Sequence, residues 1–135
     1  MDGRVHRFPV RVYYEDTDAA GLVYYANYLK FAERARTEML RLLGFRHGSL
    51  GADAAFAVRR CVVDYRRPAR LDDELAVTTR LVALGGASAR LEQIVRRGAD
   101  ELVRLDVDLA LIAPSGRPMR MPTGLRSALG PLLAT

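Results

Sequence analysis

The second half of the chain alternates between hydrophobic and polar residues, as β-strands with one buried face do. In the last such run, Leu102 to Ile112, aliphatic residues occupy every second position and charged residues fill several positions between them. Three earlier runs also have strand character and are bounded by turn residues: Phe56 to Arg67, Glu74 to Leu84 and Ser88 to Arg97. Short glycine-containing turns separate the last three strands, which predicts an antiparallel meander.

The first half of the chain predicts one strand followed by one long helix. Val5 to Tyr14 alternates loosely, and Pro9 places the start of this strand at a sheet edge. From about Tyr24 to Leu43, hydrophobic residues recur at three- and four-residue spacings, which indicates a helix with one apolar stripe. Gly44 follows as a C-terminal stop.

This order of elements predicts an α+β fold in one domain spanning residues 1–135. Two segments complete it: a loop over His47 to Ala55, and a short terminal helix over Thr123 to Leu133 with Thr123 as its N-cap. The long helix, roughly 30 Å at 1.5 Å per residue, can cover one face of the sheet. No further element covers the other face, so we expect oligomerisation to bury an edge or a face.

The composition is that of a globular protein, with 50% hydrophobic and 27% charged residues. No stretch has the length of a signal peptide or of the ~20 apolar residues of a membrane span, so we expect a cytoplasmic protein without membrane insertion. Cys61 is the single cysteine, and its place in a strand predicts a small buried residue. No Cys/His cluster has metal-ligand spacing, and no metal is expected.

The net charge of +5 comes almost entirely from arginine, since Lys30 is the only lysine. Arginine suits phosphate because its planar guanidinium binds two oxygens at once, so an anionic small molecule is a plausible partner. The alternative is that these charges are simply solvated. Nucleic-acid binding is supported by charge alone, because the chain has no RRM, KH or helix-turn-helix signature.

The candidate chemistry lies in the turn before the long helix. Asp16 and Asp18 stand in this turn, and Gly21 lets the backbone bend sharply. The start of a helix presents unpaired N–H groups, which polarise a carbonyl or bind an anion. A carboxylate beside such donors can serve acyl transfer, with the amides stabilising the oxyanion. Alternatively, both aspartates only cap the helix or form Asx-turns.

The segment Y-E-D-T-D-A-A-G-L-V-Y-Y-A-N-Y, followed by F-A-E-R-A-R-T-E, resembles acyl-CoA thioesterases of the 4-hydroxybenzoyl-CoA thioesterase family. It is most similar to the Tol-Pal-associated (YbgC-type) branch, as are the later V-D-Y-R-R-P-A-R-L-D-D and L-E-Q-I, and the resemblance covers roughly residues 8 to 122. It implies a hotdog fold, a long central helix wrapped by an antiparallel sheet of about five strands. It further implies an acyl-CoA thioester hydrolase that releases free CoA and a carboxylic acid.

Residue by residue, the resemblance implies Asp18 as nucleophile or general base, and the backbone N–H of Tyr25 as the group that polarises the thioester carbonyl. Tyr24 and Asn27 would shape the wall of the site. The YbgC-type branch typically has histidine where this chain has Tyr25, an exchange that keeps the backbone donor but removes a side chain that titrates near neutral pH. Neither His6 nor His47 matches the missing position, and we expect both at the surface.

The resemblance also implies contacts with coenzyme A. Because coenzyme A is part of the substrate, no separate cofactor is expected. Its phosphates would be held near a subunit interface by basic and hydroxyl side chains, with candidates Arg59, Arg60, Arg66, Arg67, Arg70, Ser88 and Arg90. The resemblance also implies homodimers that commonly pair into tetramers.

Two other readings remain open. A hotdog hydratase or dehydratase would use a histidine with an acidic partner, and neither histidine here stands in a matching motif. A non-catalytic hotdog module could instead bind acyl-CoA or acyl-carrier thioesters. Tyr25 keeps this hypothesis open, because it stands where the YbgC-type branch typically has histidine. The sequence determines neither the acyl group nor whether Asp18 attacks directly.

Overall fold

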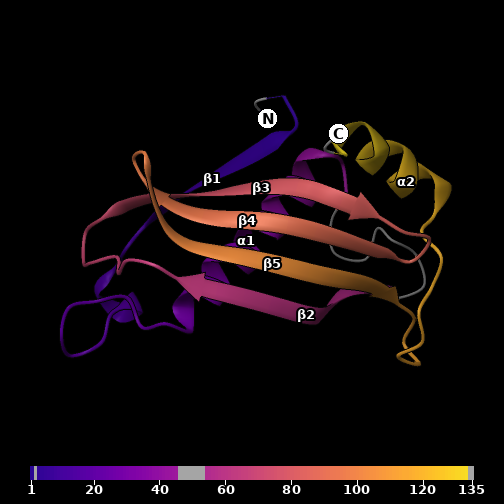
Figure 1. The fold of residues 1–135 in the computed structure, drawn as a ribbon. Helices are drawn as coiled ribbons and strands as arrows, with labels where there is room; N and C mark the ends of the chain where they lie inside the picture. Colours follow the sequence, from indigo (N-terminus) through magenta and orange to yellow (C-terminus); the bar gives the residue numbers. More distant parts are fainter. Residues whose placement is uncertain (2, 46–53, 134–135) are drawn as a thin grey trace.

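A computed structural model describes residues 1, 3–45 and 54–133. It contains a five-stranded antiparallel sheet with the strand order β1-β3-β4-β5-β2, shown in Figure 1. The strands are β1 (Val5–Arg11), β2 (Ala55–Tyr65), β3 (Glu74–Leu84), β4 (Ser88–Arg97) and β5 (Asp100–Ile112). The predicted meander of the last three strands is therefore confirmed, and β3 and β4 have the predicted bounds. The predicted loop over 47–55, and with it His47, lies mostly outside the described residues.

The long helix α1 (Asn27–Leu42) lies across one face of this sheet (Figure 1). Its buried residues recur at helical spacing and form the stripe that packs on the strands: Tyr28, Phe31, Ala32, Ala35 and Met39. The helix begins three residues later than predicted. The reason is local, because the Tyr24 amide donates to the Asp16 carbonyl at 3.0 Å and the Asn27 amide to the Tyr24 carbonyl at 2.8 Å, which makes a turn there.

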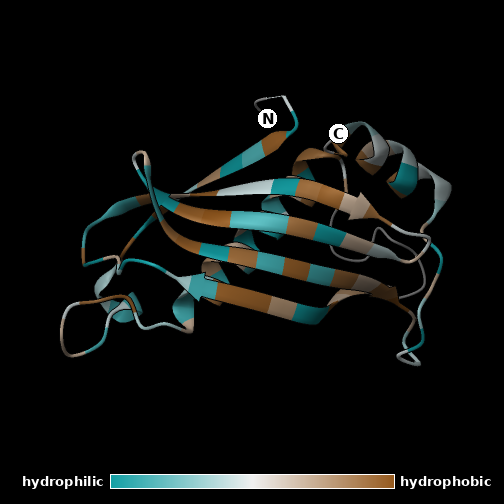
Figure 2. Ribbon diagram, viewed as in Figure 1, coloured by the Kyte–Doolittle hydropathy of each residue, from teal (hydrophilic) through white to brown (hydrophobic). Residues whose placement is uncertain are grey.

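The core lies between α1 and the inner face of the sheet. Along β5 the alternation is as expected, with the aliphatic set Val103, Leu105, Val107, Leu109 and Leu111 buried. Figure 2 shows the same alternation of hydrophobic and hydrophilic residues along the central strands. At the C-terminal end, α2 (Thr123–Leu129) and η2 (Gly130–Leu132) follow, with Leu125 and Leu129 buried. The N-cap of α2 is Pro122, so the prediction of Thr123 as the cap is wrong.

Several strand ends differ from prediction. β2 runs from Ala55 to Tyr65 instead of Phe56 to Arg67, and β5 begins at Asp100 instead of Leu102. β1 ends at Arg11, and Tyr14–Asp16 forms the short 3-10 helix η1 instead of continuing the strand. The cause is a change of partner: the Val12 amide donates to the Asp73 carbonyl at 2.9 Å, and the Tyr13 amide then turns to the Asp16 carboxylate at 2.8 Å. The chain therefore leaves the sheet two residues before Tyr14.

A buried polar group joins α1 to the sheet. Gln93 on β4 is fully buried, and its side-chain amide donates to the Ala32 carbonyl and the Thr79 hydroxyl, both at 3.0 Å. Its side-chain carbonyl accepts a 2.9 Å hydrogen bond from Arg36 on α1. His6 on β1 is buried beside this layer, and its Nδ1 has no hydrogen-bond partner among the described atoms. The prediction that His6 lies at the surface is therefore wrong, because it points inward with the core-facing residues of β1.

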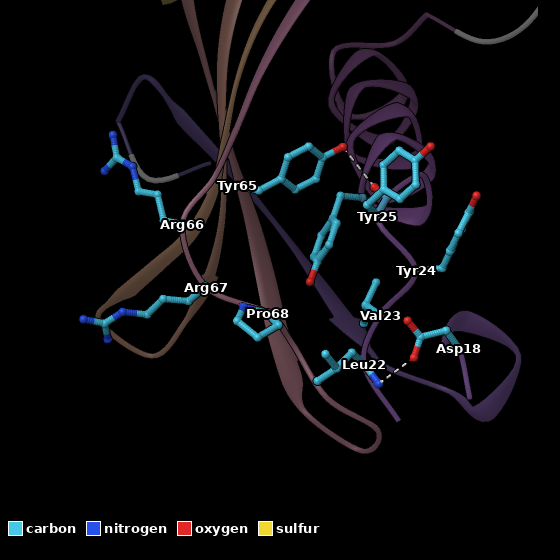
Figure 3. Close-up of a pocket in the computed structure, with 10 residues that line it drawn as sticks. Asp18, Leu22, Val23, Tyr24, Tyr25, Tyr65, Arg66, Arg67 and Pro68 are labelled. Atoms are coloured by element: carbon cyan, nitrogen blue, oxygen red, sulfur yellow. Dashed lines mark hydrogen bonds between the residues drawn. The ribbon is translucent and has the colours of Figure 1, made fainter. Parts of the chain in front are cut away.

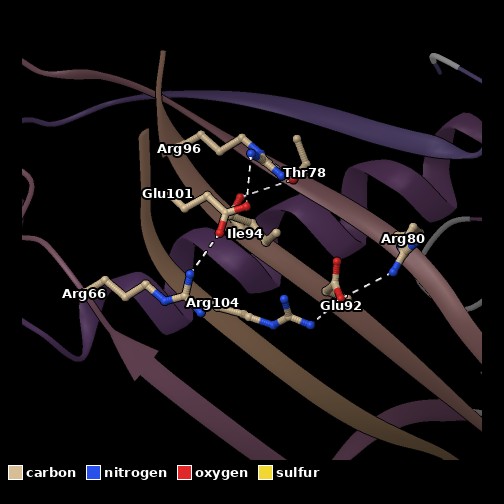
Figure 4. Close-up of polar contacts among 8 residues, drawn as sticks. All are labelled: Arg66, Thr78, Arg80, Glu92, Ile94, Arg96, Glu101 and Arg104. Atoms are coloured by element: carbon tan, nitrogen blue, oxygen red, sulfur yellow. Dashed lines mark hydrogen bonds and ion pairs between the residues drawn. The ribbon is translucent and has the colours of Figure 1, made fainter. Parts of the chain in front are cut away.

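The outer face of the sheet is polar (Figure 4). Each of two glutamates bridges two arginines: Glu92 pairs with Arg80 (3.4 Å) and Arg104 (2.6 Å), and Glu101 with Arg66 (3.1 Å) and Arg96 (3.4 Å). These pairs connect β3, β4 and β5 with one another and with Arg66, the residue that follows β2. Partly exposed pairs of this kind contribute little each, about 0–1 kcal/mol, so they make the face hydrophilic more than they stabilise the fold.

The edge strand β2 has a different character. Three of its large hydrophobic side chains are exposed, Val58 (50%), Val62 (47%) and Tyr65 (45%). Cys61 on the same strand is also exposed, so the prediction that it is buried is wrong. An edge strand has only one neighbour to cover it, and the sequence pattern does not reveal which strand lies at the edge.

Candidate active site

The turn that carries Asp18 is held by its own backbone. The Asp18 amide donates to the Leu22 carbonyl at 2.8 Å, and the Gly21 amide donates to the Asp18 carbonyl at 3.0 Å. Gly21 has a φ of 76°, which a residue with a side chain adopts at a cost. A bridge between Thr17 and Val23 closes the turn. The D-T-D-A-A-G sequence therefore forms a tight loop with Asp18 in a defined position.

The Asp18 carboxylate uses one oxygen for this loop. Its Oδ1 accepts hydrogen bonds from the amides of Ala20 (2.9 Å) and Leu22 (3.4 Å), which is the Asx-turn geometry. Its Oδ2 has no hydrogen-bond partner among the described residues, and the residue is exposed. The two readings of Asp18 are therefore compatible: one oxygen orients the side chain, and the other is available for chemistry.

The residues just before α1 supply hydrogen-bond donors. Among the described residues, the amides of Tyr25 and Ala26 have no acceptor. Both lie just ahead of the first residue of α1, where the helix dipole also favours negative charge. The Asn27 side chain donates to the Asp16 carbonyl at 2.8 Å, so it joins the helix start to the Asp18 turn.

Asp18 and Tyr25 line one open pocket together with three further tyrosines (Figure 3). The lining residues are Asp18, Leu22, Val23, Tyr24, Tyr25, Tyr28, Tyr65, Arg66, Arg67 and Pro68. The rings of Tyr24 and Tyr25 have centroids 4.8 Å apart, and Tyr65 contacts Tyr25 (6.1 Å) and Tyr28 (5.8 Å) edge to face. The wall beside the carboxylate is therefore mostly aromatic.

Two of these tyrosines are tied to the chain by their hydroxyls. Tyr28 accepts a 2.8 Å hydrogen bond from the buried amide of Ala69, and burial raises the pKa of Tyr28. Tyr65 donates to the carbonyl oxygen of Tyr25 at 3.1 Å. The V-D-Y-R-R-P motif supports the family resemblance, but sequence reasoning does not assign Tyr65 to the site. The aromatic residue of that motif, just before a proline that ends the strand, was the available signal.

Of the residues expected to hold coenzyme A, Arg66 and Arg67 line this pocket, and Arg70 forms a backbone bridge with the lining residue Leu22. Tyr24, expected in the wall of the site, also lines it. Arg67 forms a 3.6 Å ion pair with Asp100, and Figure 3 shows Arg66 and Arg67 extending away from the tyrosines. The others lie toward the opposite end of the sheet: Arg59, Arg60, Ser88 and Arg90, with Arg90 on Asp108 at 2.7 Å. Asn27 is absent from the lining. These assignments stay predictions.

In the part of the chain that the structure describes, no group of three or more His, Cys, Asp or Glu side chains could hold a metal ion. The pKa of the Cys61 thiol is raised by partial desolvation and by Asp106, against the effect of Arg36, although the side chain is exposed. A raised pKa leaves the thiol protonated and weakly nucleophilic.

Within the same described residues, no helix is long and apolar enough to cross a membrane.

A carboxylate with a free oxygen lines the same pocket as Tyr25, whose unpaired amide lies just before a helix wrapped by an antiparallel sheet; this hotdog-fold arrangement suits acyl transfer. The chain belongs to the thioesterase superfamily, whose family model matches residues 20–104. The predicted family and fold are confirmed, and the protein is a thioester hydrolase.

Two relatives and two solved structures illustrate the similarity. The chain is 47% identical over 104 residues to "Acyl-CoA thioester hydrolase YbgC" of Escherichia coli O6:H1, covering 76% of this chain and 78% of the relative. It is 43% identical over 124 residues to "Acyl-CoA thioesterase YbgC" of Haemophilus influenzae, covering 90% and 91%. A probable thioesterase from Bartonella henselae has a TM-score of 0.84 at 41% identity, covering 87% of this chain and 99% of that one. A thioesterase from Thermus thermophilus, complexed with coenzyme A and Zn, has a TM-score of 0.83 at 32% identity, covering 98% and 96%.

Proposed function

We propose that this protein hydrolyses acyl-CoA thioesters, with Asp18 as the catalytic carboxylate and the Tyr25 amide as the donor to the thioester carbonyl. The observation that carries the proposal is the presence of both groups in one pocket, each with unused hydrogen-bonding capacity. Two relatives named as acyl-CoA thioesterases and a similar structure with bound coenzyme A support the choice of substrate.

Two chemical routes fit this arrangement. In one, Oδ2 of Asp18 attacks the thioester carbon, the coenzyme A thiolate leaves, and water hydrolyses the resulting mixed anhydride. In the other, Asp18 removes a proton from a water molecule that attacks the same carbon. In both, the carbonyl oxygen becomes negative and accepts hydrogen bonds from the helix-start amides, an interaction that strengthens as charge develops.

The first experiment measures thiol release from short, long and aromatic acyl-CoAs by wild type and Asp18→Asn. We expect turnover of at least one substrate and a loss of at least 100-fold in Asp18→Asn. Retained turnover in the mutant would refute the role of Asp18. Absence of turnover on the whole panel, with binding of acyl-CoA retained, would favour the non-catalytic module. In single-turnover hydrolysis in ¹⁸O-water, label in Asp18 would establish the anhydride route, with water attacking the Asp18 carbonyl of the anhydride.

We also infer that two copies pair through their β2 strands. This edge carries unpaired backbone groups and three exposed hydrophobic side chains, which is a surface suited to strand addition. An antiparallel β2–β2 pair would bring Arg59 and Arg60 of the partner subunit toward the Tyr65 end of the strand, near the pocket. This would explain why predicted coenzyme A contacts lie far from Asp18 within one chain.

The native Cys61 gives a direct test of this pairing. A short bismaleimide should cross-link two copies through Cys61 and should fail with Cys61→Ser. Val62→Asp should lower the molar mass measured by light scattering, whereas Arg80→Asp on the outer face should not. A dimer that survives Val62→Asp and does not cross-link would refute pairing through β2.

A further inference from the structure

The carbonyl of Tyr25 is not part of the helical hydrogen-bond ladder. In a regular helix it would accept from the Leu29 amide, but that amide donates to the Ala26 carbonyl at 3.2 Å. The partner of the Tyr25 carbonyl is the Tyr65 hydroxyl at 3.1 Å, from a strand 40 residues further along the chain. The peptide unit between Tyr25 and Ala26 is therefore held from outside the helix.

The neighbouring peptide units are held locally. The Tyr24 amide is fixed by the Asp16 carbonyl at 3.0 Å, and the Tyr24 carbonyl by the Asn27 amide at 2.8 Å. The plane that contains the Tyr25 N–H is thus anchored by its own turn. The next plane contains the Tyr25 carbonyl and the Ala26 N–H, and among the described residues only Tyr65 contacts its polar atoms. The two planes meet at the Tyr25 Cα but can rotate independently about its two backbone dihedrals, so the Tyr65 hydroxyl acts directly on the plane that carries the Ala26 N–H.

We propose that Tyr65 is a positioning residue: its hydroxyl orients the Ala26 amide, so that this amide joins the Tyr25 amide as a donor to the thioester carbonyl. The proposal rests on the proposed function, since it requires a carbonyl oxygen at those donors. A hydrogen bond accepted by the Tyr25 carbonyl also polarises its peptide unit and makes the Ala26 N–H a better donor.

The surroundings of Tyr65 suit this role. Its ring packs edge to face against Tyr25 at 6.1 Å and Tyr28 at 5.8 Å, and Tyr28 is itself fixed to the Ala69 amide. The direction of the hydroxyl is therefore set by packing. Partial desolvation, with smaller effects of Cys61 and the neighbouring tyrosines, raises the pKa of Tyr65, so its hydroxyl stays protonated and able to donate at neutral pH.

The test compares Tyr65→Phe with wild type and with a matched control. Tyr65→Phe keeps the ring and removes the hydroxyl. Tyr13→Phe removes the hydroxyl of a tyrosine that is 60% exposed. We expect Tyr65→Phe to lower kcat about three- to tenfold, the range for one net hydrogen bond, with KM and melting temperature unchanged. Tyr13→Phe should match wild type in all three quantities.

A spectroscopic measurement separates positioning from packing. Isotope-edited infrared spectra of a ¹³C-carbonyl acyl-CoA bound to Asp18→Asn report how strongly the thioester carbonyl is polarised. Adding Tyr65→Phe should move the carbonyl band back toward its frequency in water, and adding Tyr13→Phe should not. The proposal is overturned if kcat and the band are unchanged, or if KM alone rises, which would mean direct substrate contact. If wild type turns over no substrate, the proposed function is refuted, and the role of Tyr65 with it. If turnover is lost in Asp18→Asn but unaffected by Tyr65→Phe, only the role of Tyr65 is refuted.

Discussion

The contact of Arg36 with Gln93 gives a quantitative prediction for how α1 is held on the sheet. Arg36 donates to the buried Gln93 carbonyl at 2.9 Å, and burial lowers the pKa of its guanidinium, with Glu33 acting in the opposite sense. Gln93→Leu would remove this acceptor and also the donor to the Thr79 hydroxyl. A hydrogen bond to a charged group contributes about 1.5–3 kcal/mol, and the Thr79 bond about 1 kcal/mol more. We therefore expect Gln93→Leu to lower the free energy of unfolding by about 2.5–4 kcal/mol.

A double-mutant cycle isolates the pair. Arg36→Met leaves the Gln93 carbonyl buried without its donor, a cost of about 1–3 kcal/mol. In the double mutant both partners are apolar, so neither penalty applies fully, and the sum of the single effects should exceed the double effect by about 1.5–3 kcal/mol. Urea denaturation at one fixed protein concentration measures all four proteins. Arg34→Met, on the exposed side of the same helix, serves as the control and should change stability by under about 0.5 kcal/mol.

Additive single mutants would refute this reasoning. Apolar replacement of buried charged groups can be neutral or stabilising, since desolvating a charge is costly. A Gln93→Leu protein as stable as wild type would show that Arg36 reaches water or another acceptor when Gln93 is lost. The hydrogen bond would then orient the helix without stabilising it.

Three further predictions concern stability. Tyr28→Phe leaves the buried Ala69 amide without its acceptor and should cost about 1–3 kcal/mol, seen as a melting temperature lower by roughly 4–10 °C. Burial raises the pKa of Asp73, but hydrogen bonds from the Arg70 amide and the Arg97 guanidinium outweigh this effect and leave the pKa lowered. Asp73→Asn should therefore cost about 1 kcal/mol of stability at pH 7. In urea titrations, the difference from wild type should vanish as pH falls below about 3.8. Burial lowers the pKa of His6, so the unfolded state binds a proton at this histidine more readily than the folded state does. Wild type should therefore lose stability in urea titrations as pH falls below about 6.5, and His6→Gln should lose less. Equal losses in the two proteins would contradict this prediction.

The parts of the fold that follow from local sequence were predictable. β3 and β4 have their predicted bounds because Gly85-Gly86 and Gly98 end strands whose alternation is regular. The Asp18 turn was predictable for the same reason, since its hydrogen bonds join residues at most four positions apart. The predicted start of α1 is wrong because Tyr24 and Tyr25 continue the apolar spacing of the helix, while their backbone bonds belong to the turn.

The errors share one physical cause, which is dependence on distant neighbours. Cys61 and His6 have opposite burial to that expected, because burial depends on strand order: β2 is an edge strand, and β1 points His6 beneath α1. Tyr65 was not assigned to the site because its contact with Tyr25 spans 40 residues. Alternation specifies which residues share a face of a strand, but it does not specify what that face meets.

The site therefore has two halves with different sensitivity to mutation. The carboxylate and the amides come from one continuous segment, residues 16 to 27, which its own hydrogen bonds shape. The opposite wall, from Tyr65 to Asp73, is positioned by long-range contacts: Tyr65 on Tyr25, Tyr28 on Ala69, and Asp73 on Arg97 at 2.8 Å. Substitutions in the first half should remove chemistry and leave folding largely intact. Substitutions in the second half should change the geometry of the donors, or the stability, while the catalytic carboxylate remains in place.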